Sequence, residues 1–408
     1  MLKMKGYNQF RNLSLARFAS LIAPVPADID IVFRLANNRS FLAAFGIAML
    51  LSLVVELMIQ PYLSRIIDRM ERRKIQAVNQ IVFAISVMAV GLEIVLLGNI
   101  EAALLVMLVL IETYYTVAYQ VYASIAQSLI KRRDAGNYSG LSEILGQTPV
   151  ILGAAISAIF WNMIPLPYIL VASGAAGIFL LFPLAFVRNA GATVLAGQTT
   201  PPAEPVIRKM KLSSVIFIFL FNMPYVAVVS GNYLKPIFIA QLLHGTPGTL
   251  AESEIIYAVS AVVAGLLAPL AIKKIGEFRS AIMFSLIYVA GSILMPLFPL
   301  IAIFFILQFS HGTGNAGNRI SRNTLVMRNV PAGEIGQFNG KVQILAVASR
   351  ILLLILYIMA IELIGVRMLM IMTGIIVLAA VTAGALLRRY ATVQMENLRL
   401  LDQEALSQ

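Results

Sequence analysis

The chain has 408 residues, of which 60% are hydrophobic and 12% are charged, and its mean hydropathy is +0.87. Because soluble globular domains contain about 25% charged residues, this balance indicates a membrane protein and excludes a soluble domain of ordinary size. Cysteine is absent, which excludes disulfide bonds and thiolate metal sites.

The net charge of +12 is concentrated at the ends of apolar runs, so we do not expect a nucleic-acid partner. Most Lys and Arg residues lie in seven places that pairs of apolar runs separate: 3–11, 65–74, 131–133, 188–211, 273–279, 319–328 and 388–399. This alternation is the positive-inside pattern of a multi-pass protein with both termini in the cytoplasm. We therefore expect a monomeric protein embedded in the lipid bilayer of the cell membrane.

The apolar runs predict an all-α membrane protein with twelve transmembrane helices, because each run has about 20 residues and does not alternate as barrel strands do. The runs cover 12–36, 41–63, 75–97, 102–123, 139–160, 168–187, 213–239, 255–272, 280–297, 299–318, 337–359 and 367–387. We expect an N-terminal six-helix half over 1–187, a Pro-rich cytoplasmic linker over 188–212, a C-terminal six-helix half over 213–390 and a cytoplasmic tail over 391–408.

The two halves carry an internal repeat. The segment DAGNYSGLSEIL at 134–145 resembles EIGQFNGKVQIL at 334–345, with two glycines and an Ile-Leu pair in the same places. Chance similarity between the starts of apolar helices is the alternative, but both copies follow the fourth span of their half. Because both copies have the same orientation, they favour pseudo-symmetric halves related by an axis along the membrane normal.

A dense charge cluster, LSRIIDRMERRK at 63–74, lies between the second and third runs. Here the sequence resembles the major facilitator superfamily, whose loop at this place has the pattern Gly-x-x-x-Asp-Arg-x-Gly-Arg-Arg. Four positions match it, Asp68, Arg69, Arg72 and Arg73, whereas Ser64 and Glu71 replace the glycines. The resemblance covers essentially the whole chain, and below the superfamily it suggests drug-efflux permeases.

The resemblance implies a major facilitator fold that works by alternating access, with spans one, four, seven and ten around a central cavity. It also implies a cytoplasmic gate made by Asp68, Arg69, Arg72 and Arg73, which would pair when the cytoplasmic side closes. Topological anchoring by positive charge is the alternative role of this loop, and the two roles are compatible.

Ionisable residues inside spans are costly and are therefore candidates for function. Asp28 and Asp30 in the first span point about 200° apart on a regular helix, whereas Asp30 and Arg34 are four residues apart and can pair. We expect Arg34 to neutralise Asp30 and to face the substrate cavity, and we expect Asp28 to be the freer carboxylate. Pro24 and Pro26 can break this helix, and acids in water at the outer interface are the alternative.

Glu112 lies about 15 Å into the fourth span at the helical rise, near the midplane, where an ionised carboxylate is costly. It is our first candidate for proton coupling, together with Asp28 and Asp30. Tyr115 and Tyr119 lie near the same helix face and are candidates for the substrate cavity. A glutamate satisfied by a neighbouring hydroxyl is the alternative.

Further cavity candidates are Asn222, His311 and Asn315, in the seventh and tenth spans. His311 can titrate near neutral pH, but a single histidine in a glycine-rich helix is also a common packing residue. Arg350, in the middle of the eleventh span, has no acidic partner in its own helix, and we expect an ion pair with Glu56 of the second span or a bond to an anionic substrate group.

These observations predict a secondary active transporter that exports a small hydrophobic or amphipathic compound in exchange for protons. Uptake or facilitated diffusion of an organic anion, held by Arg34 and Arg350, is the alternative. We do not expect an enzyme, because hydrolase and metalloprotease motifs are absent, and we expect no cofactor and no bound metal.

Overall fold

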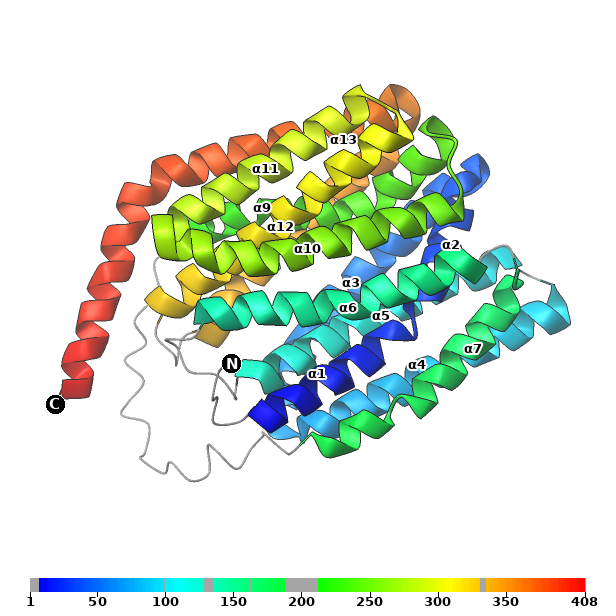
Figure 1. Ribbon diagram of the computed structural model, residues 1–408, viewed down its shortest axis with the longest axis horizontal. Coiled ribbons are helices and arrows are strands. Elements are labelled where there is room, and N and C mark those ends of the chain that lie inside the picture. The colour runs from blue at the N-terminus through cyan, green and yellow to red at the C-terminus, as the bar shows by residue number, and fades with distance from the viewer. Residues whose placement is uncertain are drawn as a thin grey trace. The chain divides into compact units, whose positions relative to one another are not determined.

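The structure is a computed structural model that describes residues 7–98, 100–127, 135–160, 163–187, 212–330 and 335–407, although side chains in some helix ends are outside this description. Nearly all of the described chain is α-helical, as the apolar runs predict (Figure 1). The elements are α1 (Tyr7–Ile22), α2 (Val25–Asn37), η1 (Arg39–Phe41), α3 (Leu42–Arg69), α4 (Arg72–Leu97), α5 (Ile100–Gln127), α6 (Ala135–Phe160), α7 (Leu166–Phe179), η3 (Phe182–Phe186), α9 (Leu212–Ile237), η4 (Phe238–Leu242), α10 (Pro247–Ile275), α11 (Glu277–Leu297), α12 (Ile301–Asn329) and α13 (Ile335–Ser407).

Within the described residues, nine helical segments are long and apolar enough to cross a membrane. One of them, Phe338–Leu387, contains the predicted spans eleven and twelve, which turn at Gly365 with a left-handed φ of 74°. The first predicted span forms two helices, α1 and α2, because Pro24 caps α2 and Pro26 lies in its first turn. The tenth forms α12, which runs on to Asn329 and is more polar than the nine.

The described chain packs as two compact units. Unit 1 contains α1 to α5, the part of α6 from Thr148 onward, α7, η3 and the first residues of α10 up to Ile255. Unit 2 contains the part of α6 up to Gln147, α9, α10 from Ile256 onward, α11, α12 and α13. The predicted linker at 188–212 lies outside the described residues except for Leu212, where α9 begins. The domain boundaries proposed from the sequence therefore stay predictions.

In unit 1, α5 packs against α1, α2, α3 and α4, and α7 packs along α4. A buried polar network joins these helices. Ser20 of α1 lies 2.7 Å from Gln80 Oε1 of α4 and 2.6 Å from the hydroxyl of Tyr122 of α5, while Gln80 donates to the carbonyl of Gly177 of α7. The Tyr114 hydroxyl also donates to the carbonyl of Ser20. Because these buried groups satisfy one another, the network fixes the order of the four helices.

In unit 2, α12 packs along α11 and α9 packs along α13. Glycines bring α12 close to its neighbours. A Cβ on Gly312 would lie 2.6 Å from the carbonyl oxygen of Tyr257 of α10, and one on Gly314 would lie 2.4 Å from the backbone nitrogen of Tyr288 of α11. Only glycine fits such backbone approaches, as is common in membrane helices.

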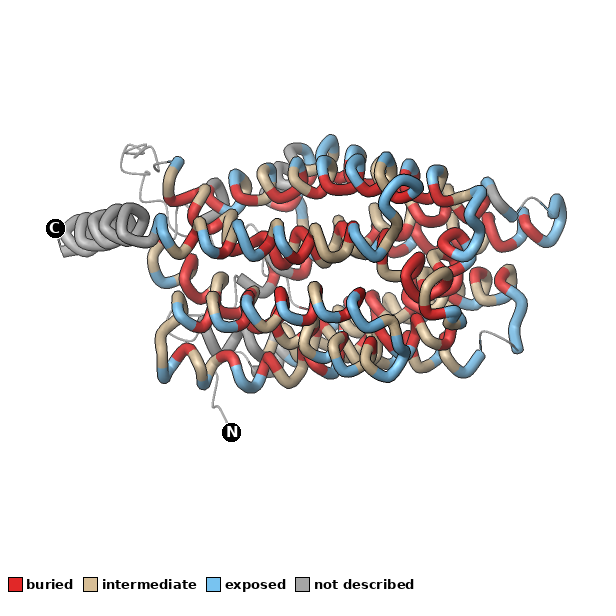
Figure 2. The backbone as a smooth tube through the Cα atoms, turned by 90° about the horizontal axis from the view of Figure 1, so that it is seen from above, coloured by how far each residue is buried: buried red, intermediate tan, exposed pale blue. Residues whose placement is uncertain are grey.

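Large apolar side chains are exposed on the outside of many helices. Figure 2 shows exposed positions recurring along the helices beside buried ones. On α4, for example, Val78 is 61% exposed and Ile85 is 59% exposed, and on α13 Leu363 is 83% exposed. Soluble proteins bury such side chains, so these faces fit a lipid environment.

Candidate functional site

In unit 1, two carboxylates lie within electrostatic range of one partly buried tyrosine, Tyr115. Asp28 of α2 and Glu112 of α5 both lie close enough to the Tyr115 hydroxyl to interact with it electrostatically. All three side chains are partly buried. The spacing on one helix already predicts that Glu112 and Tyr115 lie near each other, and the structure adds Asp28 from α2.

The aromatic rings of Tyr115 and Tyr119 lie on one side of α5. Their centroids are 5.9 Å apart with an interplanar angle of 26°, and the guanidinium carbon of Arg17, on α1, lies 5.9 Å from the Tyr119 ring centroid. Tyr119 is 44% exposed. The cluster thus combines two acids with a cation and an aromatic surface, a mixture that suits an amphipathic ligand.

Asp30 and Arg34 form the ion pair that their spacing predicts, with Arg34 Nε 3.1 Å from Asp30 Oδ2. The two ends of this pair differ in environment. Asp30 is 1% exposed, whereas the Arg34 side chain is 44% exposed. The Asp30 charge is therefore compensated within α2, whereas Asp28 lies on the Tyr115 cluster.

Unit 2 carries a second polar cluster along α12. His311, Asn315, Arg319 and Arg322 are spaced four, four and three residues apart, so they lie within about 80° of one helix face. All four lie in α12 and are at least partly buried. In the sequence, Arg319 and Arg322 belong to the basic stretch 319–328, which we expect at the cytoplasmic end of the tenth span, and this location stays a prediction. The structure shows that α12 continues past both residues to Asn329.

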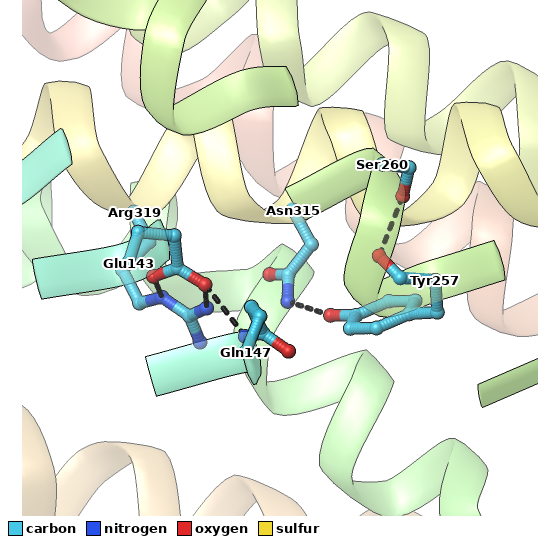
Figure 3. Close-up of polar contacts among 6 residues, drawn as sticks. All are labelled: Glu143, Gln147, Tyr257, Ser260, Asn315 and Arg319. Carbon is cyan, nitrogen blue, oxygen red and sulfur yellow. Dashed lines mark hydrogen bonds and ion pairs between the residues drawn. The ribbon is translucent and has the colours of Figure 1, made fainter. Parts of the chain in front are cut away.

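Glu143 of α6 binds Arg319 through both carboxylate oxygens. Arg319 Nε lies 3.0 Å from Glu143 Oε2, and Arg319 Nη2 donates to Oε1. Gln147, one turn along α6, also donates to Oε1, at 2.7 Å. Figure 3 shows the carboxylate facing the guanidinium, with Gln147 beside them. The fork geometry makes this a strong, directional pair.

Arg322 has different partners. It donates through Nη1 to the side-chain oxygen of Asn222 on α9 and through Nη2 to Asn323 Oδ1 at 3.4 Å. Asn222 is 3% exposed. Tyr225, on the next turn of α9, interacts electrostatically with both Arg319 and Arg322. Arg322 therefore contacts two neutral amides.

The other candidates on α12 pack against aromatic rings. The His311 ring stacks on Tyr288 with centroids 4.2 Å apart, which is the packing role considered for it. Asn315 is 1% exposed and donates to the Tyr257 hydroxyl at 2.6 Å, as Figure 3 shows. Lys235 lies 6.0 Å from the Tyr257 ring centroid.

At the predicted gate, the side chains of Asp68 and Arg69 lie outside the described residues. Arg72 donates to the carbonyl of Ser124 at the end of α5, and Arg73 donates to the carbonyl of Ala185 in η3. Within unit 1 these two arginines hold the start of α4 to neighbouring helix ends. A gating role for the loop stays a prediction.

The predicted pair of Glu56 and Arg350 also stays a prediction. Glu56 is 8% exposed in α3 of unit 1, and Arg350 is 4% exposed in α13 of unit 2. Both side chains take part in interactions. Among the described residues, no group of three or more His, Asp and Glu side chains could hold a metal ion.

Sequence reasoning missed Glu143, Arg319 and Arg322. The i, i+4, i+8, i+11 spacing from His311 to Arg322 could have shown one polar helix face. Glu143 also stands in the internal repeat, opposite Gln343 in the second copy, so its charge is specific to the first copy. No feature of the sequence, however, indicated that Glu143 and Arg319 meet.

Comparison with known proteins identifies the family to which the chain belongs. Residues 38–354 match the sequence profile of the Major Facilitator Superfamily, so the chain belongs to this superfamily of membrane transporters. A comparison with curated protein sequences gave no match.

Solved structures of transporters have a similar fold. A nucleoside transporter has a TM-score of 0.68 and 12% identity, covering 93% of this chain and 98% of that chain. A human organic anion transporter has a TM-score of 0.67 and 13% identity, covering 94% and 100%. A bacterial homologue of the iron transporter ferroportin, outward-facing, has a TM-score of 0.66 and 16% identity, covering 95% and 98%. At these identities the likeness concerns the fold.

Proposed function

We propose that this transporter couples the movement of protons to the export of a small amphipathic compound. The observation that carries the proposal is that Asp28 and Glu112 both lie within electrostatic range of the Tyr115 side chain. Two carboxylates that both act on one tyrosine in a partly buried place disfavour each other's ionised form. A proton bound there relieves this effect, and its release restores it.

Proton binding affects transport because the proton and the substrate compete for the same carboxylates, Asp28 and Glu112. When the cluster holds a proton, its net negative charge falls and a ligand cation or hydroxyl competes less well for the carboxylates. A substrate and a proton that exclude each other at one site exchange across the membrane, which is antiport. For antiport, a further support is a partial resemblance in α6 to the pattern Gly-Pro-x-x-Gly-Gly that exporters of the superfamily tend to have. Pro149 and Gly153 match two of its four defined positions, and Thr148 and Leu152 replace the other two glycines.

The test uses purified full-length protein in proteoliposomes. A substrate is first found by thermal-shift screening, and its counterflow and its accumulation under an imposed pH gradient are then measured. We expect Glu112→Gln to retain counterflow but to lose most accumulation driven by the gradient. The matched control is Glu93→Gln, because Glu93 is an exposed carboxylate of α4.

Two results would contradict the proposal. Gradient-driven accumulation that Glu112→Gln and Asp28→Asn leave unchanged would remove the proton site from this cluster. Transport that does not respond to a pH gradient at all would favour the alternative, facilitated diffusion or uptake of an organic anion. Arg34 is a weaker anchor for such an anion, since Asp30 already balances its charge.

A further inference from the structure

We propose that Arg322 and Asn222 form an anion subsite in unit 2 that binds the carboxylate of a monoanionic substrate. The inference deepens the proposed function by naming a chemical group that the transported compound carries, and it rests on the protein being a small-molecule transporter. Its residues belong to α12 and α9 and are separate from the Tyr115 cluster.

The first argument is charge. Glu143 already binds Arg319 with both of its oxygens, so this pair is neutral. Arg322, one turn further along α12, adds a positive charge and interacts unfavourably with Arg319. Among the described residues, no carboxylate contacts Arg322. The cluster of Glu143, Arg319 and Arg322 therefore carries one net positive charge in a partly buried place.

Removing a cation from water costs desolvation free energy, and hydrogen bonds to neutral amides offset only part of that cost. An anion bound to Arg322 would offset the rest of this desolvation free energy by charge pairing. The electrostatic energy of this site therefore falls when an anionic group binds Arg322, which makes Arg322 a candidate for binding an anionic substrate.

The second argument is donor geometry. A guanidinium presents parallel N–H groups that match the two oxygens of a carboxylate. Asn222 accepts from Arg322 through Oδ1, and its Nδ2 makes no hydrogen bond to the described residues. An amide N–H therefore stands beside the guanidinium as a further donor. Tyr225, within electrostatic range of Arg322, supplies a hydroxyl from the same helix, α9.

The net charge selects among anions. One positive charge is matched by one carboxylate, whereas a dianionic phosphate would leave a negative charge in excess at the Glu143 side. A neutral amide of the same shape would gain hydrogen bonds but no charge compensation. We therefore assign the subsite to the single carboxylate of an amphipathic compound, which has an apolar body and can carry a hydroxyl as well.

The test is binding to purified full-length protein in detergent, without any gradient. Octanoate and benzoate are compared with octanamide and benzamide, and with inorganic phosphate, by isothermal titration and thermal unfolding. We expect at least one carboxylate to bind about ten-fold more tightly than its amide, since 1.4 kcal/mol of charge interaction corresponds to ten-fold. Arg322→Gln is expected to abolish this preference.

Asn222→Asp provides a second variant that does not depend on removing the arginine. It places a carboxylate on Arg322, so it should also abolish carboxylate binding while leaving unfolding of the ligand-free protein unchanged or at higher temperature. The matched control is Arg328→Gln, because Arg328 lies on the same helix and pairs with Glu277 at a more exposed place. It should bind carboxylates as the wild type does.

The proposal is overturned if no carboxylate binds more tightly than its amide, if phosphate binds more tightly than the carboxylates, or if Arg322→Gln and Asn222→Asp both keep the preference. Because this binding is measured without a pH gradient, its outcome is independent of the accumulation assay. Failure of proton coupling and failure of the anion subsite are therefore distinguished.

Discussion

Arg319 and Arg322 lie one turn apart on α12, yet the first is bound by the carboxylate of Glu143 and the second by the amide of Asn222. Of these two arginines on one helix face, the first therefore has an anionic partner and the second a neutral one. This contrast separates a structural cation from one that can bind a ligand, and it sets the expected behaviour of variants at each position.

Removing one member of the Glu143 and Arg319 pair should cost more stability than removing both. Glu143→Gln leaves a guanidinium that is mostly buried and uncompensated, and Arg319→Gln leaves a carboxylate in the same condition. The double variant leaves neither charge. We expect each single variant to unfold at lower temperature than the double variant, measured by thermal unfolding in detergent. Additive losses would show that the two residues are not coupled.

Asp30 and Arg34 should respond asymmetrically to substitution. Arg34→Gln leaves a carboxylate that is 1% exposed without its cation, whereas Asp30→Asn leaves an arginine whose side chain is 44% exposed and can reach a polar surrounding. We therefore expect Arg34→Gln to lower the unfolding temperature more than Asp30→Asn does. If the two variants lowered the unfolding temperature equally, the burial of Asp30 would not determine how much stability this ion pair contributes.

The glycine contacts of α12 should be intolerant of a single methyl group. In Gly314→Ala the new Cβ would lie 2.4 Å from the backbone nitrogen of Tyr288, which cannot move as a side chain does. We expect a loss of about 1–3 kcal/mol of stability. Gly231→Ala on α9 is the matched control, because nothing lies within 4 Å of its Cβ, and it should be neutral or stabilising by about 0.5–1 kcal/mol.

The loop between α3 and α4 should influence transport more than stability. If Asp68 pairs across the halves when the cytoplasmic side is closed, Asp68→Asn should lower the transport rate while expression and membrane insertion survive. The measurement is counterflow per mole of reconstituted protein. Unchanged transport kinetics would leave the loop with topological anchoring alone.

Much of the fold could be predicted from the sequence because membrane helices are selected by length and hydropathy. The starts and ends of α4, α9 and α11 fall within a few residues of the predicted spans. Local rules also sufficed where both partners lie on one helix, as for Asp30 and Arg34. The break at Pro24 follows from the chemistry of proline.

The candidate sites could be predicted only in part, because they depend on which helices become neighbours. Glu112, Tyr115 and Asp28 were each recognisable, but their meeting requires α2 to pack on α5. Arg319 was recognisable only as one of the basic residues that flank apolar runs, whereas in the structure it binds Glu143 of another helix. A single sequence does not contain that pairing.

The polarity of α12 also bears on how the protein is made. α12 is more polar than α9, α10 and α11, which are long and apolar enough to cross a membrane. An arginine such as Arg319 leaves water at acceptable cost only when its counter-charge is already in place. Glu143 and Asn222 both precede α12 in the chain, so they are synthesised before α12. We therefore expect stable insertion of α12 to depend on α6, the earlier helix that carries Glu143.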